Sequence, residues 1–417
     1  MRIIALDDTS MKDILTDLLK RDPNNYGEYE NTVREIVERI RKEGDTALFE
    51  YTRRFDGAAM NPASIRVTEK EIREAMKEVD PALLAVMKKI HGKYSPLSRK
   101  NSLKNSWFDT QPDGTILGQK VTALESVGVY VPGGKAAYPS TVLMDIIPAK
   151  VAGAERIVMV TPPGKDGKVN SVTLIAAHLA GANEVYKAGG AQAIAALAFG
   201  TESIPRVDKI VGPGNIFVAL AKKAVYGHVS IDSIAGPSEI LVIADKTADP
   251  RYVAADLLSQ AEHDELASAI LVTDSMELAE QVSEQADSFL EQLSRRDIIR
   301  CSLDNYGYIL VTDSMEQAVE TANRIAPEHL EIVTERPFEV MTKIRNAGAI
   351  FIGEYSSEPL GDYFAGPNHT LPTNGTARFS HPWVWMILLK NPVSFTIQRR
   401  RLKRPIRRSR LLPRRSS

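Results

Sequence analysis

The sequence predicts an α/β protein with two domains, each a parallel sheet covered by helices. Its 417 residues exceed the usual size of one domain. After about residue 120, short β-branched runs such as ERIVMVTPP alternate with alanine-rich stretches such as GAQAIAALAFG. This alternation is typical of strand–helix–strand units, which build parallel sheets.

The first part of the chain predicts helices instead. Between residues 11 and 110, apolar residues recur at spacings of three and four, which is the period of an amphipathic helix. Thr68 is a predicted N-cap and Pro81 a predicted helix boundary.

A strand-then-helix motif occurs twice. LVTDSMELAEQV and LVTDSMEQAVET begin thirty-nine residues apart. We expect Asp274 and Asp313 to cap the two helices, with Glu277 and Glu316 completing capping boxes. Duplication and convergence explain this echo equally well, and both predict strand then helix. Glycine-rich segments at 129–140 and 232–240 are candidate crossings between the domains.

Composition limits the possible partners and ligands. Cys301 is the only cysteine, which excludes disulfides within the chain and a thiolate zinc cluster, so a metal needs His, carboxylate or amide ligands. Residues 381–417 carry eleven Lys or Arg and no acid; because the whole chain sums to −1, residues 1–380 sum to −12. That acidity argues against nucleic acid. With no membrane-length apolar run and no signal-peptide pattern, we expect a cytoplasmic protein.

Two glycine turns follow strand-like runs, VYVPGG and VGPGN. Such turns lie at the carboxyl ends of strands, where open α/β sheets bind ligands. Neither matches the GxGxxG dinucleotide fingerprint, and each taken alone is more often a structural turn.

Two segments carry candidate metal ligands. In LSQAEHDE, Gln260 and His263 are three residues apart and would share one face of a helix. The long loop GDYFAGPNHTLPTNGTARFS adds Asp362 and His369. Together they make a nitrogen and oxygen ligand set, although any one of them alone is more often structural.

The segment RIAPEHLEI places Glu328 beside His329, the two residue types that most often transfer protons. A surface glutamate with a capping histidine is the alternative. Three of the seven histidines, His263, His329 and His369, lie in these segments, which favours a functional site.

Together, VGVYVPGGKAAYPSTVLMDIIPAKVAG, KAGGAQAIAALAFGT, VGPGNIFV, AGPSEILVIAD, LLSQAEHD, IAPEHLEI and GDYFAGPNHTLPTNGTARFS resemble the histidinol dehydrogenase family, over residues 1 to about 380. The resemblance implies two related, incomplete Rossmann-like domains with N-terminal helices, in a homodimer. It also implies oxidation of L-histidinol to L-histidine, with zinc and NAD, in two hydride transfers through L-histidinaldehyde.

The resemblance assigns roles residue by residue. Zinc ligands would be Gln260, His263 and Asp362; the proton-transfer pair Glu328 and His329; the NAD contacts Tyr130, Gln192 and Asn215; and the substrate contacts Ser238, Gln260, His263, His329, Asp362 and His369. It also implies an NAD-binding domain of residues 1–25 and 131–236, and a zinc-binding catalytic domain of residues 26–130 and 237–380.

The resemblance ends after Ser380. The family continues with roughly GVDDFIKKSSFIYYS and a small terminal domain, whose histidine is the fourth zinc ligand; no such histidine follows here. Plausible codons for residues 383–398 spell that family segment in a shifted frame, so we hypothesise a frameshift just before Trp383. We expect the basic tail, residues 381–417, to be disordered. A basic arm that binds nucleic acid is the alternative.

Three functions follow from this sequence. The first is a zinc- and NAD-dependent dehydrogenase, impaired by the altered C-terminus. The second is an inactive remnant that acts only as a folded binding or dimerisation module. The third, a zinc hydrolase, lacks the HExxH spacing.

Overall fold

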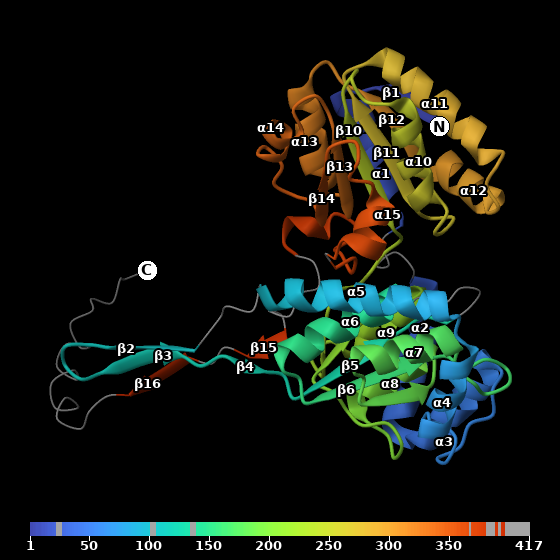
Figure 1. The fold of residues 1–417 in the computed structure, drawn as a ribbon, viewed down its shortest axis with the longest axis vertical. Coiled ribbons are helices and arrows are strands. Elements are labelled where there is room, and N and C mark those ends of the chain that lie inside the picture. The colour runs from blue at the N-terminus through green and yellow to red at the C-terminus, as the bar shows by residue number, and fades with distance from the viewer. Residues whose placement is uncertain are drawn as a thin grey trace.

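The computed structural model describes residues 1–21, 27–100, 106–133, 139–366, 368–380, 388–390 and 393–396. It contains two parallel sheets, one in each of two units, and helices cover both faces of each sheet (Figure 1). The predicted α/β class is confirmed. The two unit cores are made by the apolar strand residues, which are buried on both sheet faces as in other parallel sheets.

The first unit has five strands in the order β7-β6-β5-β8-β9, paired in parallel. They are β5 (Ser126–Tyr130), β6 (Arg156–Thr161), β7 (Glu184–Lys187), β8 (Lys209–Val211) and β9 (Ser230–Ile231). One face packs against α2 (Gly27–Glu43), α3 (Asp45–Tyr51), α8 (Gly190–Phe199) and α9 (Ile216–Val225). The other face packs against α4 (Glu69–Glu78), α5 (Pro81–Lys100), α6 (Pro139–Ala152) and α7 (Ser171–Ala180).

The second unit has six parallel strands in the order β1-β12-β11-β10-β13-β14. They are β1 (Arg2–Ala5), β10 (Glu239–Ala244), β11 (Ser268–Thr273), β12 (Gly307–Val311), β13 (His329–Val333) and β14 (Ala349–Ile352). On one face lie α10 (Pro250–Ala261), α11 (Met276–Leu290) and α12 (Arg296–Tyr306); on the other lie α1 (Asp8–Leu19), α13 (Met315–Ile325) and α14 (Pro337–Met341).

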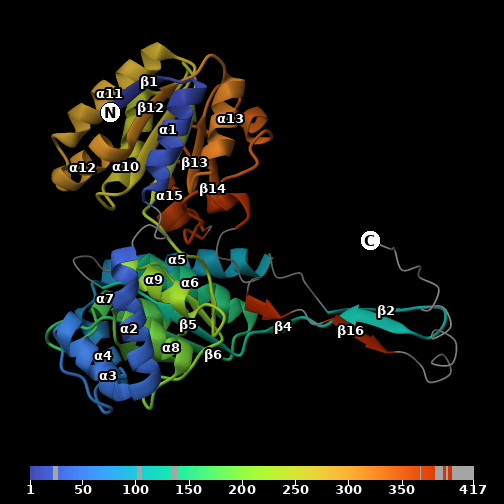
Figure 2. The ribbon, with the colours of Figure 1, turned by 180° about the vertical axis from the view of Figure 1, so that it is seen from behind.

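The expected allocation of the N-terminal segments to the domains is wrong. The resemblance places residues 1–25 with 131–236, but β1 pairs with β12 and completes the second sheet (Figure 2). It places residues 26–130 with 237–380, but α2 packs on α8 and α9, and α5 packs on α6, in the first unit. The physical reason is burial: β1 closes an open sheet edge, while the amphipathic helices cover the first sheet.

The chain crosses between the units in the predicted segment 232–240, after β9 and before β10. The other candidate crossing, 129–140, is wrong because β5 and α6 on either side of it both belong to the first unit. Helix α5 also bridges the units. Its Tyr94 hydroxyl donates to the carbonyl of Tyr363, and Lys93 lies 3.4 Å from the ring centroid of Phe364.

The helix starts follow local hydrogen-bonding rules. Thr68 caps α4 with a complete capping box, as predicted. The repeated strand-then-helix motif is confirmed, because β11 leads into α11 and β12 leads into α13. The predicted caps Asp274 and Asp313 are wrong by one residue: Ser275 and Ser314 cap these helices. A hydroxyl accepts the backbone N–H three residues on as well as a carboxylate does, so the sequence allowed either register.

Part of the tail has regular structure. A thin arm extends from the first unit and contains β2 (Trp107–Thr110), β3 (Ile116–Gln119) and β16 (Val393–Thr396), all antiparallel (Figure 1). At its base, β15 (Leu389–Lys390) pairs with β4 (Thr122–Ala123). The expected disorder is therefore wrong for β15 and β16, each of which pairs with the free edge of another strand. Trp383 and residues 397–417 lie outside the described residues.

Within the described residues, no helix is both long enough and apolar enough to cross a membrane. The remaining short elements are η2 (Thr52–Asp56), α15 (Glu358–Leu360), η3 (Gly361–Ala365) and η4 (Thr376–Arg378). The π-helical turn η3 contains Tyr363 and Phe364, which α5 contacts through Tyr94 and Lys93.

Replacing Leu388 by alanine tests whether the tail belongs to the fold. Its side chain is fully buried in the core beneath α5 to α7, and its carbonyl accepts from Leu124 N at 2.8 Å. We expect the free energy of unfolding of the first unit, measured with urea, to fall by about 2–5 kcal/mol. The exposed Phe338→Ala (67% exposed) is the control, with a change within about 0.5 kcal/mol. Equal stability of the two variants would show that the tail does not pack.

Candidate functional site

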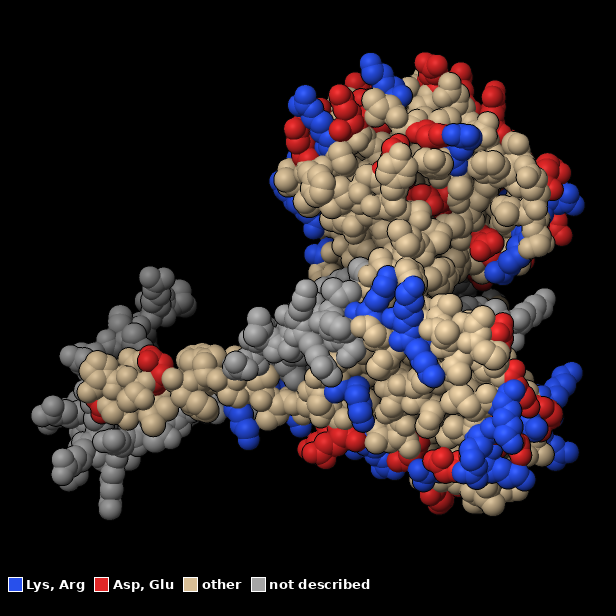
Figure 3. Space-filling view, in the orientation of Figure 1, with Lys and Arg blue, Asp and Glu red and all other residues tan. Residues whose placement is uncertain are grey.

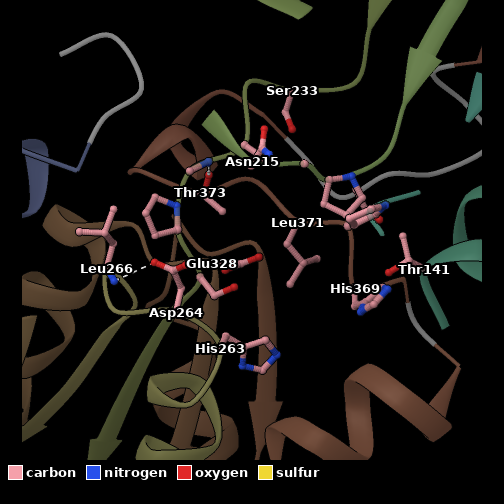
Figure 4. A pocket seen from close by; sticks show the side chains of 18 of the residues that line it. Thr141, Asn215, Ser233, His263, Asp264, Leu266, Glu328, His369, Leu371 and Thr373 are labelled. Carbon is pink, nitrogen blue, oxygen red and sulfur yellow. Dashed lines mark hydrogen bonds between the residues drawn. The ribbon is translucent and has the colours of Figure 1, made fainter. Parts of the chain in front are cut away.

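A cavity of about 560 Å³ lies between the two units. From the first unit, it is lined at the carboxyl ends of β5, β8 and β9, by residues including Pro132, Asn215 and Asp232. From the second, it is lined at the amino ends of β10 and β13 (Figure 4). The rule that ligands bind at carboxyl ends therefore holds for the first sheet alone. The size suits a small-molecule ligand.

Seven of the predicted site residues line this cavity: Asn215, Ser238, Gln260, His263, Glu328, His329 and His369. They come from five separate stretches of chain. The folding of both units is therefore needed to bring them together, which agrees with a site at a domain interface.

Glu328 and His329 enter the cavity at the start of β13. Both are buried, and both contact the first residue of the neighbouring strand β10. A carboxylate oxygen of Glu328 accepts from the backbone N–H of Glu239 at 2.9 Å. The Nδ1 of His329 lies 2.9 Å from the carbonyl oxygen of Glu239, which can only accept, so Nδ1 carries the proton. In the neutral ring this leaves Nε2 as the proton acceptor.

Gln260 is the last-but-one residue of α10, and its side chain is 1% exposed. Its Nε2 lies 3.4 Å from His329 Nδ1; because both atoms carry protons in this tautomer, the contact is not a hydrogen bond. Its Oε1 is buried and has no hydrogen-bond partner among the described residues. A buried amide oxygen without a partner costs free energy, so it is a natural ligand for a cation.

His263 is not on the helix with Gln260, contrary to the sequence prediction. Helix α10 ends at Ala261, and Glu262 is its C-cap. The ring is held instead by Nδ1, which donates to the carbonyl of Ser259 at 2.9 Å and leaves Nε2 as the acceptor. The two side chains still line the same cavity, because the chain turns into it where the helix ends.

The donors present fit a borderline metal in part. The buried Oε1 of Gln260 and the ring of His263 are the oxygen and nitrogen types that zinc accepts. Asp362, the third predicted ligand, lies in η3, and its side chain is outside the described residues. Among the described side chains, no group of three His, Cys, Asp or Glu residues is arranged to hold a metal.

The loop with His369 is attached to the first unit. Asn368 donates to the carbonyl of Met144 at 2.6 Å, and the Thr370 hydroxyl donates to Asp145 at 3.1 Å, both on α6. Burial, and next the negative charge of Asp232, raise the pKa of Asp145 well above its ordinary value. His369 therefore lies in the cavity opposite Glu328 because α6 fixes the residues on either side of it (Figure 4).

Two predicted nucleotide contacts, Tyr130 and Gln192, do not line this cavity. Tyr130 ends β5 and Gln192 lies in the first turn of α8, where the Tyr130 hydroxyl accepts from Gly190 N at 3.2 Å. Gln192 Nε2 donates to Asp56 at 3.4 Å. Burial raises the pKa of Tyr130 to about 12 and that of Asp56 to about 6. Asn215 does line the cavity, with its side-chain oxygen capping α9.

Sequence reasoning missed Arg21 and Glu239, which form a buried ion pair of 2.7 Å next to Glu328. Glu239 stands in the quoted motif AGPSEILVIAD, as a charge directly before an apolar strand, which was a usable signal. Arg21 carried no such signal in the sequence, because it follows α1 and lies more than two hundred residues before Glu239.

Comparisons with known proteins agree on one family. Residues 19–411 match the family model described as histidinol dehydrogenase, so the match runs past residue 380 into the tail. The histidinol dehydrogenase of Halalkalibacterium halodurans is 55% identical over 92% of this chain and 88% of its own length. The histidinol dehydrogenase of Bacillus subtilis is 57% identical over 85% of this chain and 82% of its own length. The crystal structure of histidinol dehydrogenase from Elizabethkingia anophelis superposes with a TM-score of 0.90 and is 37% identical in sequence. The match covers 97% of this chain and 92% of that one.

The buried Asp56 predicts a pH dependence of stability. Its folded pKa of about 6 exceeds the ordinary value of 3.8, so the folded state favours the protonated carboxyl. The contribution of this carboxyl to the free energy of unfolding is therefore at its maximum below pH 4 and is lost as the pH rises through 6. We expect Asp56→Asn to be more stable than wild type at pH 8, by about 1–2 kcal/mol after allowing for partial exposure, and equal at pH 4. Urea unfolding at both values, with the exposed Asp274→Asn as control, measures this; a pH-independent difference would contradict it.

Proposed function

The chain belongs to the histidinol dehydrogenase family, the oxidoreductases that oxidise histidinol in histidine biosynthesis, and we propose that it uses zinc and NAD to do so. The reaction would take L-histidinol to L-histidine through L-histidinaldehyde, in two hydride transfers. The observation that carries the proposal is the buried pair Glu328 and His329, facing a cavity that Gln260 and His263 also line.

His329 would act as the base for the substrate hydroxyl. Its Nδ1 proton is committed to the carbonyl of Glu239, so Nε2 of the neutral ring is left to accept a proton. Glu328, which is adjacent, would remove a proton from the water that adds to the aldehyde before the second oxidation. Its carboxylate is oriented by Glu239 N, and burial limits competing water.

Gln260, His263 and Asp362 would hold zinc. The partnerless buried Oε1 of Gln260 supports this, because it is an acceptor facing no donor. Bound zinc would hold the imidazole and amino nitrogens of histidinol and so fix its orientation. Ser238 and His369 line the same cavity and would complete the substrate contacts, with His369 fixed from the first unit.

NAD would bind at the first sheet, through Tyr130, Gln192 and Asn215, and would take up the two hydrides. The loops after β5 and β8 support this, because they form the carboxyl edge of a parallel sheet and line the cavity. The Asp56 cluster at the start of α8 adds polar groups on the same side of the sheet.

This copy would be an impaired enzyme. The only histidine in residues 381–417 is His381, so the histidine that the resemblance implies as the fourth zinc ligand is not among these residues. A frameshift before Trp383 would explain the change; the codons of the gene decide whether the shifted frame encodes the family segment. An inactive binding or dimerisation module is the second candidate function. The ordered segment from Leu388 to Lys390 favours it in one respect, because the altered tail still supports the fold.

The arm supports a homodimer. Among the described residues, none of the apolar core clusters includes a residue of β2 or β3. Trp107 and Phe108 are 54% and 59% exposed. Ile116 and Leu117 of β3 are also exposed, and the face of the arm that Figure 3 shows carries few charges among its described residues. A free-standing three-stranded sheet with apolar side chains on its surface needs a partner surface. We expect a second copy of the chain to cover it.

The metal and the activity are tested together. We expect the purified chain to hold less than one zinc per chain and to form NADH from histidinol slowly, because losing a ligand weakens the site by about 10–100-fold or more. A chelator should abolish the activity. His263→Asn should lose zinc further, whereas His178→Asn, on the exposed side of α7, should not.

Metal analysis and NADH absorbance give separate outcomes. Tightly held zinc with rapid turnover would contradict the impairment. Unchanged zinc content in His263→Asn would contradict the metal site. A folded chain that binds NAD and histidinol with no turnover would support the inactive module.

Replacing Trp107 and Phe108 by serine tests the dimer. We expect wild type to be a dimer and the double variant a monomer in gel filtration with light scattering, because the arm loses its apolar contacts. Phe338→Ser, at an equally exposed site of the second unit, should leave the dimer intact. A monomeric wild type would contradict the proposed assembly.

A further inference from the structure

Glu239 contacts both members of the proposed proton-transfer pair. Its backbone N–H donates to the Glu328 carboxylate at 2.9 Å, and its Oε2 accepts from Glu328 N at 3.4 Å. Its carbonyl accepts from His329 Nδ1 at 2.9 Å. One residue therefore sets the position of the carboxylate and the tautomer of the imidazole.

The Glu239 side chain is itself fixed by three donors. Arg21 Nη2 donates to Oε1 at 2.7 Å, and Asn374 N donates to the same oxygen at 3.2 Å. Glu328 N supplies the third, at Oε2. Because all three partners donate, only a carboxylate satisfies them; a glutamine in its place would direct an NH₂ group at a donor.

Arg21 anchors this arrangement from outside the strand. It is 0% exposed, and its Nη1 donates to the carbonyl of Leu266 at 3.0 Å. A buried ion pair contributes little net stability, since removing two charges from water offsets their attraction. Apolar residues would hold this position at lower cost, so stability alone does not account for the pair.

We propose that Glu239 is a positioning residue for this reaction, which orients Glu328 and His329 and is held in place by Arg21. The inference rests on the proposed roles of Glu328 and His329. It adds a residue from β10, and one from the turn after α1, to a site otherwise made of groups proposed to contact the substrate or the metal. Neither Glu239 nor Arg21 needs to touch the substrate.

The test compares Glu239→Gln with wild type by two readouts. In ¹⁵N-histidine spectra, with His329 assigned by its loss in His329→Gln, wild type should show the Nδ1–H tautomer. Glu239→Gln keeps the backbone carbonyl that accepts from His329 Nδ1, but it turns an NH₂ group toward Glu328 N. This should displace the start of β13, so that the spectra show a mixture of the two tautomers. In NADH assays, kcat should fall about 10–100-fold, while KM for histidinol and the dissociation constant for NAD change less than about threefold.

The matched control is Glu71→Gln, which breaks a largely buried ion pair with Lys187 in the first unit, away from the cavity. It should alter neither the tautomer nor kcat. If Glu239→Gln does not fold, Arg21→Lys keeps the charge but cannot reach Glu239 and Leu266 together, and should shift both readouts in the same direction by less.

The outcomes separate the inference from the function on which it rests. A folded Glu239→Gln with the wild-type tautomer and kcat would overturn the positioning role. Absence of NAD binding and of NADH formation in wild type would overturn the proposed function, and the tautomer comparison would still decide whether Glu239 fixes His329.

Discussion

The register between β10 and β13 is the constraint on which the site depends. Ile240 pairs with His329, so the residues just before them, Glu239 and Glu328, become neighbours at the amino edge of the sheet. Their backbone and carboxylate groups then bond reciprocally. A shift by one residue would turn every side chain of β13 to the opposite face and would remove His329 from the cavity.

The cavity joins opposite ends of two sheets. The first unit presents the carboxyl edge of its strands, as open parallel sheets do, while the second presents its amino edge. Contacts across the interface hold this geometry: α6 fixes the loop of His369, and α5 holds η3, which contains Asp362. In the proposed function, a nucleotide on the first unit and a metal on the second would therefore face one substrate, with the redox partner and the proton acceptor on separate units.

The tail illustrates how tolerant strand pairing is. Leu388 occupies a core position, and Val393 and Phe395 lie in the strand that pairs with the open edge of β3. A strand edge accepts any residues that can be extended and donate backbone hydrogen bonds. A metal ligand is different, because it requires one particular side chain, so a change of sequence in this segment would affect a metal site more than it affects the fold.

Local chemistry let the sequence by itself determine the fold class, the repeated strand-helix unit, the cap at Thr68 and the residue types of the site. These follow from periodicity, hydrogen-bonding preference and motif. Only the tertiary structure decided which unit receives β1, that His263 lies beyond its helix, that Tyr130 and Gln192 lie outside the cavity, and that Arg21 pairs with Glu239. Each of these depends on contacts between segments distant in sequence, and no local pattern encodes the burial and register that select them.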